Sequence, residues 1–319
     1  MDFLITLLRA MPGAVGQGLI WGIMAIGVYL TFRILDVADL TVDGSMATGG
    51  AVCVLLTVNG CNIWVAVLCA FLAGMLAGLA TGIFHTFCGI PAILSGILTQ
   101  LALYSINLRI MGWGTDAGTK ASLAVSVNDY PLLVSSRFIR ETNLTNPIFL
   151  LVIMILALVA LLYWFFGTER GSSLRATGSN PNMARAQGIN TQFNIVLGLM
   201  ISNGLVALSG ALLAQYQGSV TVDMGRGAIV IGLAAVIIGE VLLGKVFHNF
   251  ALKLFSLVVG AIIYYIVLQL VLRLGLDTND LKLLTALVVA VFLAIPYWKG
   301  KYMPSRTRNI PQNGGERHA

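Results

Sequence analysis

The chain has 319 residues, of which 58% are hydrophobic and 10% are charged, and its mean hydropathy is +0.89. A soluble domain carries about 25% charged residues, so this chain has too few charges to cover a surface that faces water. The composition excludes a disordered chain, a nucleic-acid-binding protein and an ordinary soluble enzyme. It predicts a polytopic membrane protein, whose net charge of +6 is explained by basic cytoplasmic loops.

Apolar segments recur along the chain, and a transmembrane helix needs about 20 such residues. A shorter apolar segment, 45–58, follows the polar run 36–44, and an amphipathic stretch covers residues 1–11. Counting these pieces separately gives nine to ten segments in place of eight. The eight clear segments are 13–32, 63–84, 93–110, 147–166, 193–216, 228–243, 250–272 and 281–296.

Lysine and arginine side chains predict the orientation, because basic loops stay in the cytoplasm. They gather in the middle loop 167–192, in the polar tail 299–319, and at Lys245 and Lys253 around a short turn. Counted back from the tail, all three regions fall on one side, and the stretch 112–146 falls outside. We therefore expect a transmembrane domain over residues 1–298, with 167–192 as its cytoplasmic loop, and a cytoplasmic tail over 299–319.

Glycines recur every four residues at Gly74, Gly78 and Gly82, and Gly18 and Gly22 repeat the pattern on the first span. Small residues at this spacing let another helix approach closely. The partner helix is either in the same subunit or in a second copy.

A three-residue sequence occurs once in each half of the chain. Thr41-Val42-Asp43 and the triplet 221–223 have the same sequence, 180 positions apart, and each precedes a shortened apolar segment. Paired interruptions of this kind are typical of transporters built from two repeats with a pathway between them. A match of three residues also arises by chance.

Carboxylates next to apolar segments are the first candidates for a substrate pathway. Asp39, Asp43 and Ser45 precede or begin a short helix, and a charge in the membrane usually faces a cavity or a partner. The functional interpretation is that this helix end lines a polar passage. The structural interpretation is that Asp43 and Ser45 cap the helix that follows.

Two further polar residues sit at the ends of spans. Glu240 lies near the end of its segment and close to Lys245, so it is either a pathway residue or half of a structural ion pair. Asn107 lies beside Arg109, where it either meets substrate at the pathway mouth or caps the helix beside an arginine that reaches toward the interface.

The familiar catalytic motifs are missing from the sequence. Residues 239–245 resemble a phosphate-binding loop, but Val246 replaces the hydroxyl residue that would hold magnesium, and the motif ends an apolar helix. The four cysteines and three histidines are scattered without the spacing of a metal site or a redox dithiol. We therefore expect no catalytic residue, metal site or cofactor in this chain.

The middle loop contains a short, strongly capped helix. Asn180 is the predicted N-cap, Pro181 opens the first turn, and Gly188 ends the helix after Gln187. So much capping favours a helix that plugs a cleft in a partner protein over a solvated connecting loop.

The loop pattern G-x-x-L-R-A-x-G-x-N-x-x-x-A-x-x-x-G-I over 171–189 resembles the coupling-helix loop of ATP-binding-cassette (ABC) importer permeases of the branched-chain amino-acid and ribose type. Residues 33–45, 96–112 and 228–240 are similar to the subgroup associated with tryptophan, tyrosine or general amino-acid uptake. The resemblance covers the chain from about Gly13 to Trp298.

This resemblance implies an all-α polytopic permease of the bacterial cell membrane, with about 8–10 transmembrane helices, some of them broken. It implies two ATPase subunits that carry ATP and magnesium, an extracellular lipoprotein or periplasmic binding protein, and a second permease copy with the pathway at the interface. The implied coupling residues are Arg175, Gly178, Asn180, Ala184, Arg185, Gln187 and Gly188. The pathway residues are Asp39, Asp43, Ser45, Asn107 and Glu240.

The function that follows is amino-acid import, with aromatic amino acids favoured. Two alternatives remain from the sequence. One is a sugar or nucleoside importer of the same architecture, and the other is a secondary transporter that uses the membrane carboxylates as proton sites.

Overall fold

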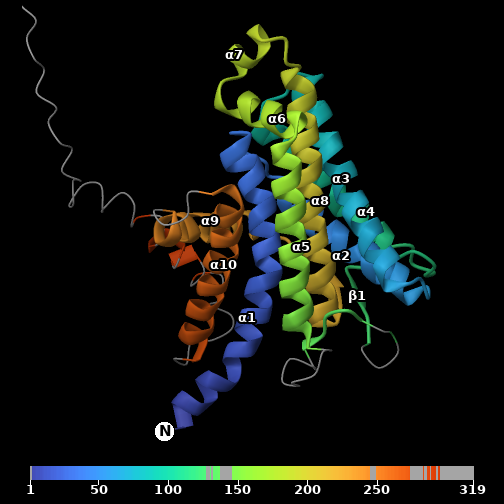
Figure 1. The fold of residues 1–319 in the computed structure, drawn as a ribbon. Coiled ribbons are helices and arrows are strands. Elements are labelled where there is room, and N and C mark those ends of the chain that lie inside the picture. Colours follow the sequence, from blue (N-terminus) through green and yellow to red (C-terminus); the bar gives the residue numbers. More distant parts are fainter. Residues whose placement is uncertain are drawn as a thin grey trace, which may run out of the picture.

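The computed structural model is a bundle of long helices with smaller elements at both ends (Figure 1). It describes residues 2–126, 130, 132–136, 146–244 and 249–273, together with isolated positions between 283 and 294. The predicted last span, 281–296, and the predicted tail, 299–319, lie outside the continuously described ranges.

Within the described residues, six helical stretches are long and apolar enough to cross a membrane. Two shorter apolar helices, α2 (Val42–Val58) and α9 (Ala228–Leu243), accompany them. This confirms the predicted polytopic all-α fold with shortened helices. The long helices are α1 (Asp2–Tyr29) with its π-helical end η1 (Leu30–Ile34), α3 (Ile63–Thr86), α4 (Ala92–Met111), α5 (Pro147–Gly167), α8 (Thr191–Gln217) and α10 (Phe250–Arg273).

Three of these helices begin at an asparagine that caps them. The side chains of Asn62, Asn146 and Asn190 accept hydrogen bonds from the backbone N–H groups of the first turns of α3, α5 and α8. A cap of this kind satisfies one of the N–H groups that a helix start leaves without a partner. The caps explain why these helices start where the polar stretches end.

Helix α8 lies at the centre of the bundle and packs on α1, α2 and α3. Two hydroxyl groups of α8 bind it to α1: Ser202 donates to the carbonyl of Gly27, and Ser209 donates to that of Ile20, both at 2.8 Å. By contrast, α5 exposes most of its apolar surface, and only 22% of its span is buried. This exposed face is the surface expected to contact lipid.

The glycine stripes pack within the subunit. Gly74, Gly78 and Gly82 of α3 lie against the backbone of α8, and a Cβ at Gly82 would lie 3.0 Å from the Cα of Val196. Gly18 and Gly22 of α1 face α10 in the same way, at Ile262 and Val258. The spacing left open whether the partner helix lies in the same subunit or in a second copy. In the structure it lies in the same subunit.

The two ends of the bundle differ (Figure 1). One end carries α6 (Glu169–Ser179) and α7 (Pro181–Ala186), which form the middle loop. The other carries an antiparallel pair of short strands, β1 (Ser122–Ala124) and β2 (Ser219–Thr221), with Leu123 opposite Val220. The loop 167–192 and the described part of the stretch 112–146 therefore lie at opposite ends, as predicted from their charges.

The first testable prediction concerns the α3–α8 contact. A Cβ on Gly78 would lie 2.9 Å from the Cα of Met200, closer than real Cβ contacts come. We expect Gly78→Val to lower the free energy of unfolding by about 1–3 kcal/mol or more, since overpacking forces backbone shifts. Thermal melting in detergent measures this. The matched control is Gly167→Val at the end of α5, where a Cβ meets nothing within 4 Å; equal melting temperatures for the two variants would contradict the packing.

Candidate functional site

Two half-length helices begin at one junction inside the bundle. After η1, an irregular segment leads to α2, and the carboxylate of Asp43 in the first turn of α2 reaches the start of α9. Its Oδ2 accepts the N–H of Gly227 at 2.9 Å, and its Oδ1 accepts the N–H of Ile229 at 3.1 Å. Both bonds satisfy free N–H groups at a helix start, and the negative charge suits the positive end of the α9 dipole.

The predicted capping role of Asp43 is therefore corrected. Asp43 caps α9, 184 residues further along the chain, and not the helix that it begins. The N-cap position of α2 is Thr41, whose side chain makes no capping bond. Ser45 does not cap α2 either, because its hydroxyl donates to Asn203 of α8 at 2.6 Å.

Asp39 lies in a closed polar network beside this junction. Its side chain is 3% exposed, and both oxygens have donors: the N–H of Thr41 at 2.9 Å and the amide of Asn203 at 2.7 Å. Asn203 in turn accepts the hydroxyl of Ser45. A buried carboxylate without donors would cost several kcal/mol. Asp39 and Ser45 thus hold the irregular segment and α2 against α8.

A chain of threonine hydroxyls extends the network to two more helices. Thr41 is 2.7 Å from Thr81 of α3, and Thr81 donates to Thr99 of α4 at 2.9 Å. Sequence reasoning missed Asn203, Thr81 and Thr99. The available signal was an amide or hydroxyl inside an apolar span, which marks helix–helix contacts in membranes but does not say which residue is its partner.

A cavity of about 240 Å³ opens on the other side of Asp43. It lies between the start of α2, one face of α4 and the turn before α9. Asn107 is 1% exposed, and its Oδ1 has no hydrogen-bond partner among the described residues. A buried carbonyl oxygen without a hydrogen-bond donor lowers the stability of the fold by about 1–3 kcal/mol. Such an oxygen is explained if a ligand supplies the missing donor. The lining residues are Asp43, Gly44, Gln100, Leu101, Tyr104, Asn107, Val222 and Arg226.

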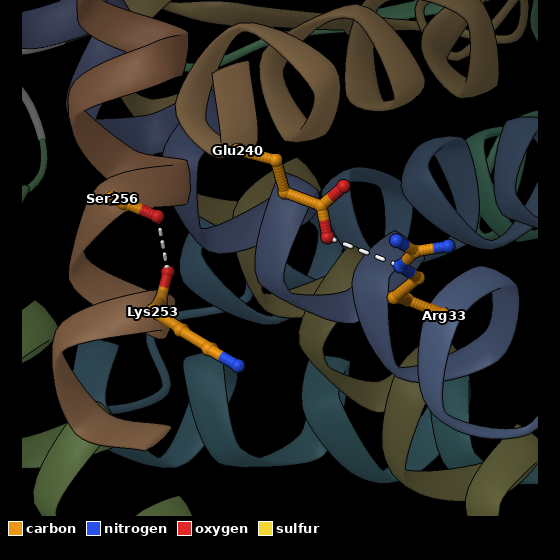
Figure 2. A network of polar contacts seen from close by, with 4 residues as sticks. All are labelled: Arg33, Glu240, Lys253 and Ser256. Atoms are coloured by element: carbon orange, nitrogen blue, oxygen red, sulfur yellow. Dashed lines mark hydrogen bonds and ion pairs between the residues drawn. The ribbon is translucent and has the colours of Figure 1, made fainter. Parts of the chain in front are cut away.

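Glu240 lies at the opposite end of α9. Its Oε1 is 3.2 Å from the Nε of Arg33 in η1, and Figure 2 shows the two side chains facing each other. Glu240 thus forms an ion pair with Arg33, whereas the predicted pair with Lys245 involves a residue outside those that the structure describes. Of the predicted pathway residues, the structure brings only Asp43 and Asn107 to one cavity.

The middle loop contains the predicted capped helix and a second one. Asn180 accepts the N–H of Met183 at 3.0 Å, Pro181 stands in the first turn of α7, and Gly188 adopts a positive φ of 78°. Helix α6, which precedes α7, was not predicted from the sequence. Its inward residues, Gly171, Leu174 and Thr177, follow helical spacing and are buried.

The predicted coupling residues divide into two groups. Arg175 and Gly178 hold α6 to the bundle: the Arg175 guanidinium lies 4.8 Å from the Phe250 ring centre, and Gly178 touches the backbone of Ile34 in η1. Ala184 of α7 is 1% exposed. The second group, Arg185 and Gln187, is exposed, and Arg185 donates a hydrogen bond to the Thr191 hydroxyl at 2.9 Å. Met183, which was not among the predicted residues, lies beside them and is 58% exposed.

These contacts connect the middle loop to the junction. Gly178 of α6 packs on η1, and η1 continues into the segment held by Asp39. Arg33 of η1 also pairs with the end of α9, whose start is capped by Asp43. A series of direct contacts therefore connects α6 with both half-helices.

An apolar bundle in which two half-length helices meet beside a cavity that is lined in part by polar side chains is the architecture of a membrane transport subunit. The comparison with known families agrees and is more specific. The chain belongs to the family described as the permease component of the branched-chain amino acid transport system, which matches residues 11–295. It is thus a multi-pass bacterial membrane permease of the ABC importer type.

Three relatives illustrate the range of similarity. A tyrosine transport system permease protein of Clostridioides difficile is 41% identical over 87% of this chain and 88% of its own length. An uncharacterized protein of Rickettsia prowazekii is 33% identical over 92% of this chain and 98% of its own length. A fructose import permease of Bifidobacterium longum is 28% identical over 79% of this chain and 68% of its own length.

The second prediction tests the buried network. Asn203→Ala removes one donor from a buried carboxylate, and such charged hydrogen bonds contribute about 1.5–3 kcal/mol. We expect the unfolding free energy to fall by that amount, measured by thermal or denaturant unfolding in detergent. Asn182→Ala, at an exposed position of α7, is the matched control. If Asn203→Ala were as stable as the wild type, the hydrogen bond from Asn203 of α8 to Asp39 would not contribute to the stability of the fold.

Proposed function

We propose that this chain is the membrane-spanning subunit of an ATP-driven importer of amino acids, with tyrosine and tryptophan as the favoured substrates. The single observation that carries the substrate assignment is the 41% identity, over 87% of the chain, to a relative named as a tyrosine transport permease. The sugar permease among the relatives is less similar, at 28% identity. A sugar importer is the alternative within the same architecture.

The loop 167–192 is the proposed docking site for an ATPase dimer, which binds ATP and magnesium. Met183, Arg185 and Gln187 are exposed on or beside α7 at the end of the bundle, where a partner cleft can receive them. Asn180 and Gly188 fix the two ends of this helix. A binding protein delivers substrate at the opposite end, and a second copy of the chain completes the transporter.

The proposed mechanism is alternating access driven by the ATPase. Closure of the ATPase dimer around ATP displaces α6 and α7, and the contact of Gly178 with η1 passes this movement to the half-helices. A ligand can drive such a change only through its different affinities for the two states. ATP supplies this difference in the partner subunit, and this chain supplies the rigid connection.

The substrate pathway is proposed to pass the cavity that Asp43 and Asn107 share. Its volume, about 240 Å³, lies just below the range of about 300–1,000 Å³ typical of small-molecule sites. Oxygen acceptors at Asp43 and Asn107 suit the ammonium group of an amino acid, Arg226 suits its carboxylate, and Leu101 and Tyr104 suit an apolar or aromatic side chain. Asp39, Ser45 and Glu240 act as supports for this site.

The third prediction tests the docking site. In proteoliposomes containing the permease, its ATPase and its binding protein, Met183→Glu combined with Gln187→Glu should abolish stimulation of ATP hydrolysis by substrate. The new charges oppose entry into a closely packed cleft, while both side chains are exposed and the fold is retained. Met183→Leu combined with Gln187→Asn, which adds no charge at the same two positions, is the control. Normal stimulation in the double glutamate variant would rule out α7 as the coupling element.

The fourth prediction separates a pathway role of Asn107 from a structural one. Asn107→Leu removes an acceptor without a partner, so stability should be unchanged or higher. Uptake of labelled tyrosine should fall by about fivefold to a hundredfold, because the substrate loses its hydrogen bond to the Asn107 oxygen, which contributes about 1–3 kcal/mol. Ser105→Leu, exposed on the same helix, should leave uptake unchanged.

The same uptake assay discriminates between the functions. Competition by unlabelled tryptophan supports the amino-acid assignment, whereas competition by fructose or a nucleoside alone would favour the sugar or nucleoside alternative. Uptake that continues without the ATPase and stops with a proton uncoupler would instead indicate a secondary transporter. Uptake by Asn107→Leu at the wild-type rate would exclude this cavity from the pathway.

A further inference from the structure

A second cavity, of about 1020 Å³, lies at the α6–α7 end of the bundle and takes no part in the proposed transport pathway. It is formed by the end of α1 and η1, the end of α5, the α6 helix and the start of α10. Its size is that of the largest small-molecule sites. It joins the middle loop to three membrane helices.

The lining of this cavity carries basic side chains on three different elements. Arg33 comes from η1, Arg175 from α6 and Lys253 from α10, and no described lining residue is acidic. Glu240 neutralises Arg33 from outside the cavity, so two positive charges remain. Lys253 is exposed, and Figure 2 shows its side chain extending from α10, with the nitrogen below the Arg33–Glu240 pair in this view.

Arg175 is held in place for binding an anion. It donates to the backbone carbonyl of Phe166, and its guanidinium lies 5.4 Å from the Phe166 ring centre and 4.8 Å from that of Phe250. A guanidinium has five N–H donors, so this bond leaves others for a phosphate. The aromatic contacts order the side chain in advance, which lowers the entropy cost of binding.

The aromatic rim puts the cavity at the level of the lipid headgroups. Trp164 is 71% exposed and Tyr163 is 50% exposed, both near the end of α5, the helix whose exposed face is expected to contact lipid. Exposed tryptophan and tyrosine at the end of a span are typical of the membrane–water interface. The apolar side chains exposed along the rest of α5, such as Leu156 and Leu161, extend from the cavity toward the middle of the bilayer.

We propose that this cavity binds the headgroup of an anionic phospholipid, with its phosphate between Arg175 and Lys253 and its acyl chains along α5. Basic pockets between membrane helices on the cytoplasmic side attract such lipids, and the basic loops predict that this end faces the cytoplasm. A bound lipid bridges α6 to α10. It thereby stabilises the attachment of the middle loop to the bundle.

The experiment measures lipid retention on the purified full-length permease by native mass spectrometry, after addition of phosphatidylglycerol or phosphatidylcholine. We expect phosphatidylglycerol to be retained preferentially. Lys253→Gln should weaken its binding by about fivefold, the effect of one basic residue near an anionic surface, and Lys253→Arg should restore it. Arg109→Gln, an exposed basic position at the other end of the bundle, should bind as the wild type does.

Equal retention of the two lipids, or unchanged phosphatidylglycerol binding in Lys253→Gln, would overturn the proposal. So would an equal loss in Arg109→Gln, because the preference would then reflect overall charge. A third arm adds soluble glycerol phosphate. Failure to displace the lipid at millimolar concentration supports a lipid site, and displacement would show a site for a free phosphate instead.

Discussion

The capping of α9 by Asp43 is the interaction on which the rest of the site depends. A helix that starts inside a membrane leaves N–H groups with no water to satisfy them, and each such group costs several kcal/mol in lipid. The Asp43 carboxylate supplies two acceptors, to Gly227 and Ile229, and thereby allows α9 to start in the middle of the bundle. The same bonds hold α2 and α9 at one point and leave the adjacent cavity open to a ligand.

The polar groups near the junction divide according to whether their bonds are complete. Asp39, Ser45 and Asn203 satisfy one another and connect helices. Asn107 Oδ1 is buried and finds no partner in the described part of the chain. A complete network stabilises and specifies the fold, while an incomplete one marks a place where a ligand completes it.

Much of the fold could be predicted from local pattern. The apolar spans, the shortened segments after the two polar breaks, the cap at Asn180 and the close-packed glycine stripe all depend on residues within a few turns of each other. The partners could not be predicted in this way. Asp43 meets a helix start 184 residues away and Glu240 meets Arg33 at a separation of 207, and no local periodicity records such pairings. The triplet repeated 180 residues apart falls at the start of α2 and a few residues before α9, and its origin as a true repeat stays a prediction.

The central claim is that the cavity between α2, α4 and α9 is a water-accessible part of the substrate pathway. It is tested most directly by a cysteine at Gln100, which lines this cavity, in a chain whose four native cysteines are replaced by alanine. We expect a charged thiol reagent to modify this cysteine in the reconstituted transporter and tyrosine to slow the modification, while a cysteine at Ser105, exposed on the α4 span, stays unmodified. If a cysteine at position 100 never reacts, in any nucleotide state, the cavity is not part of a water-accessible pathway.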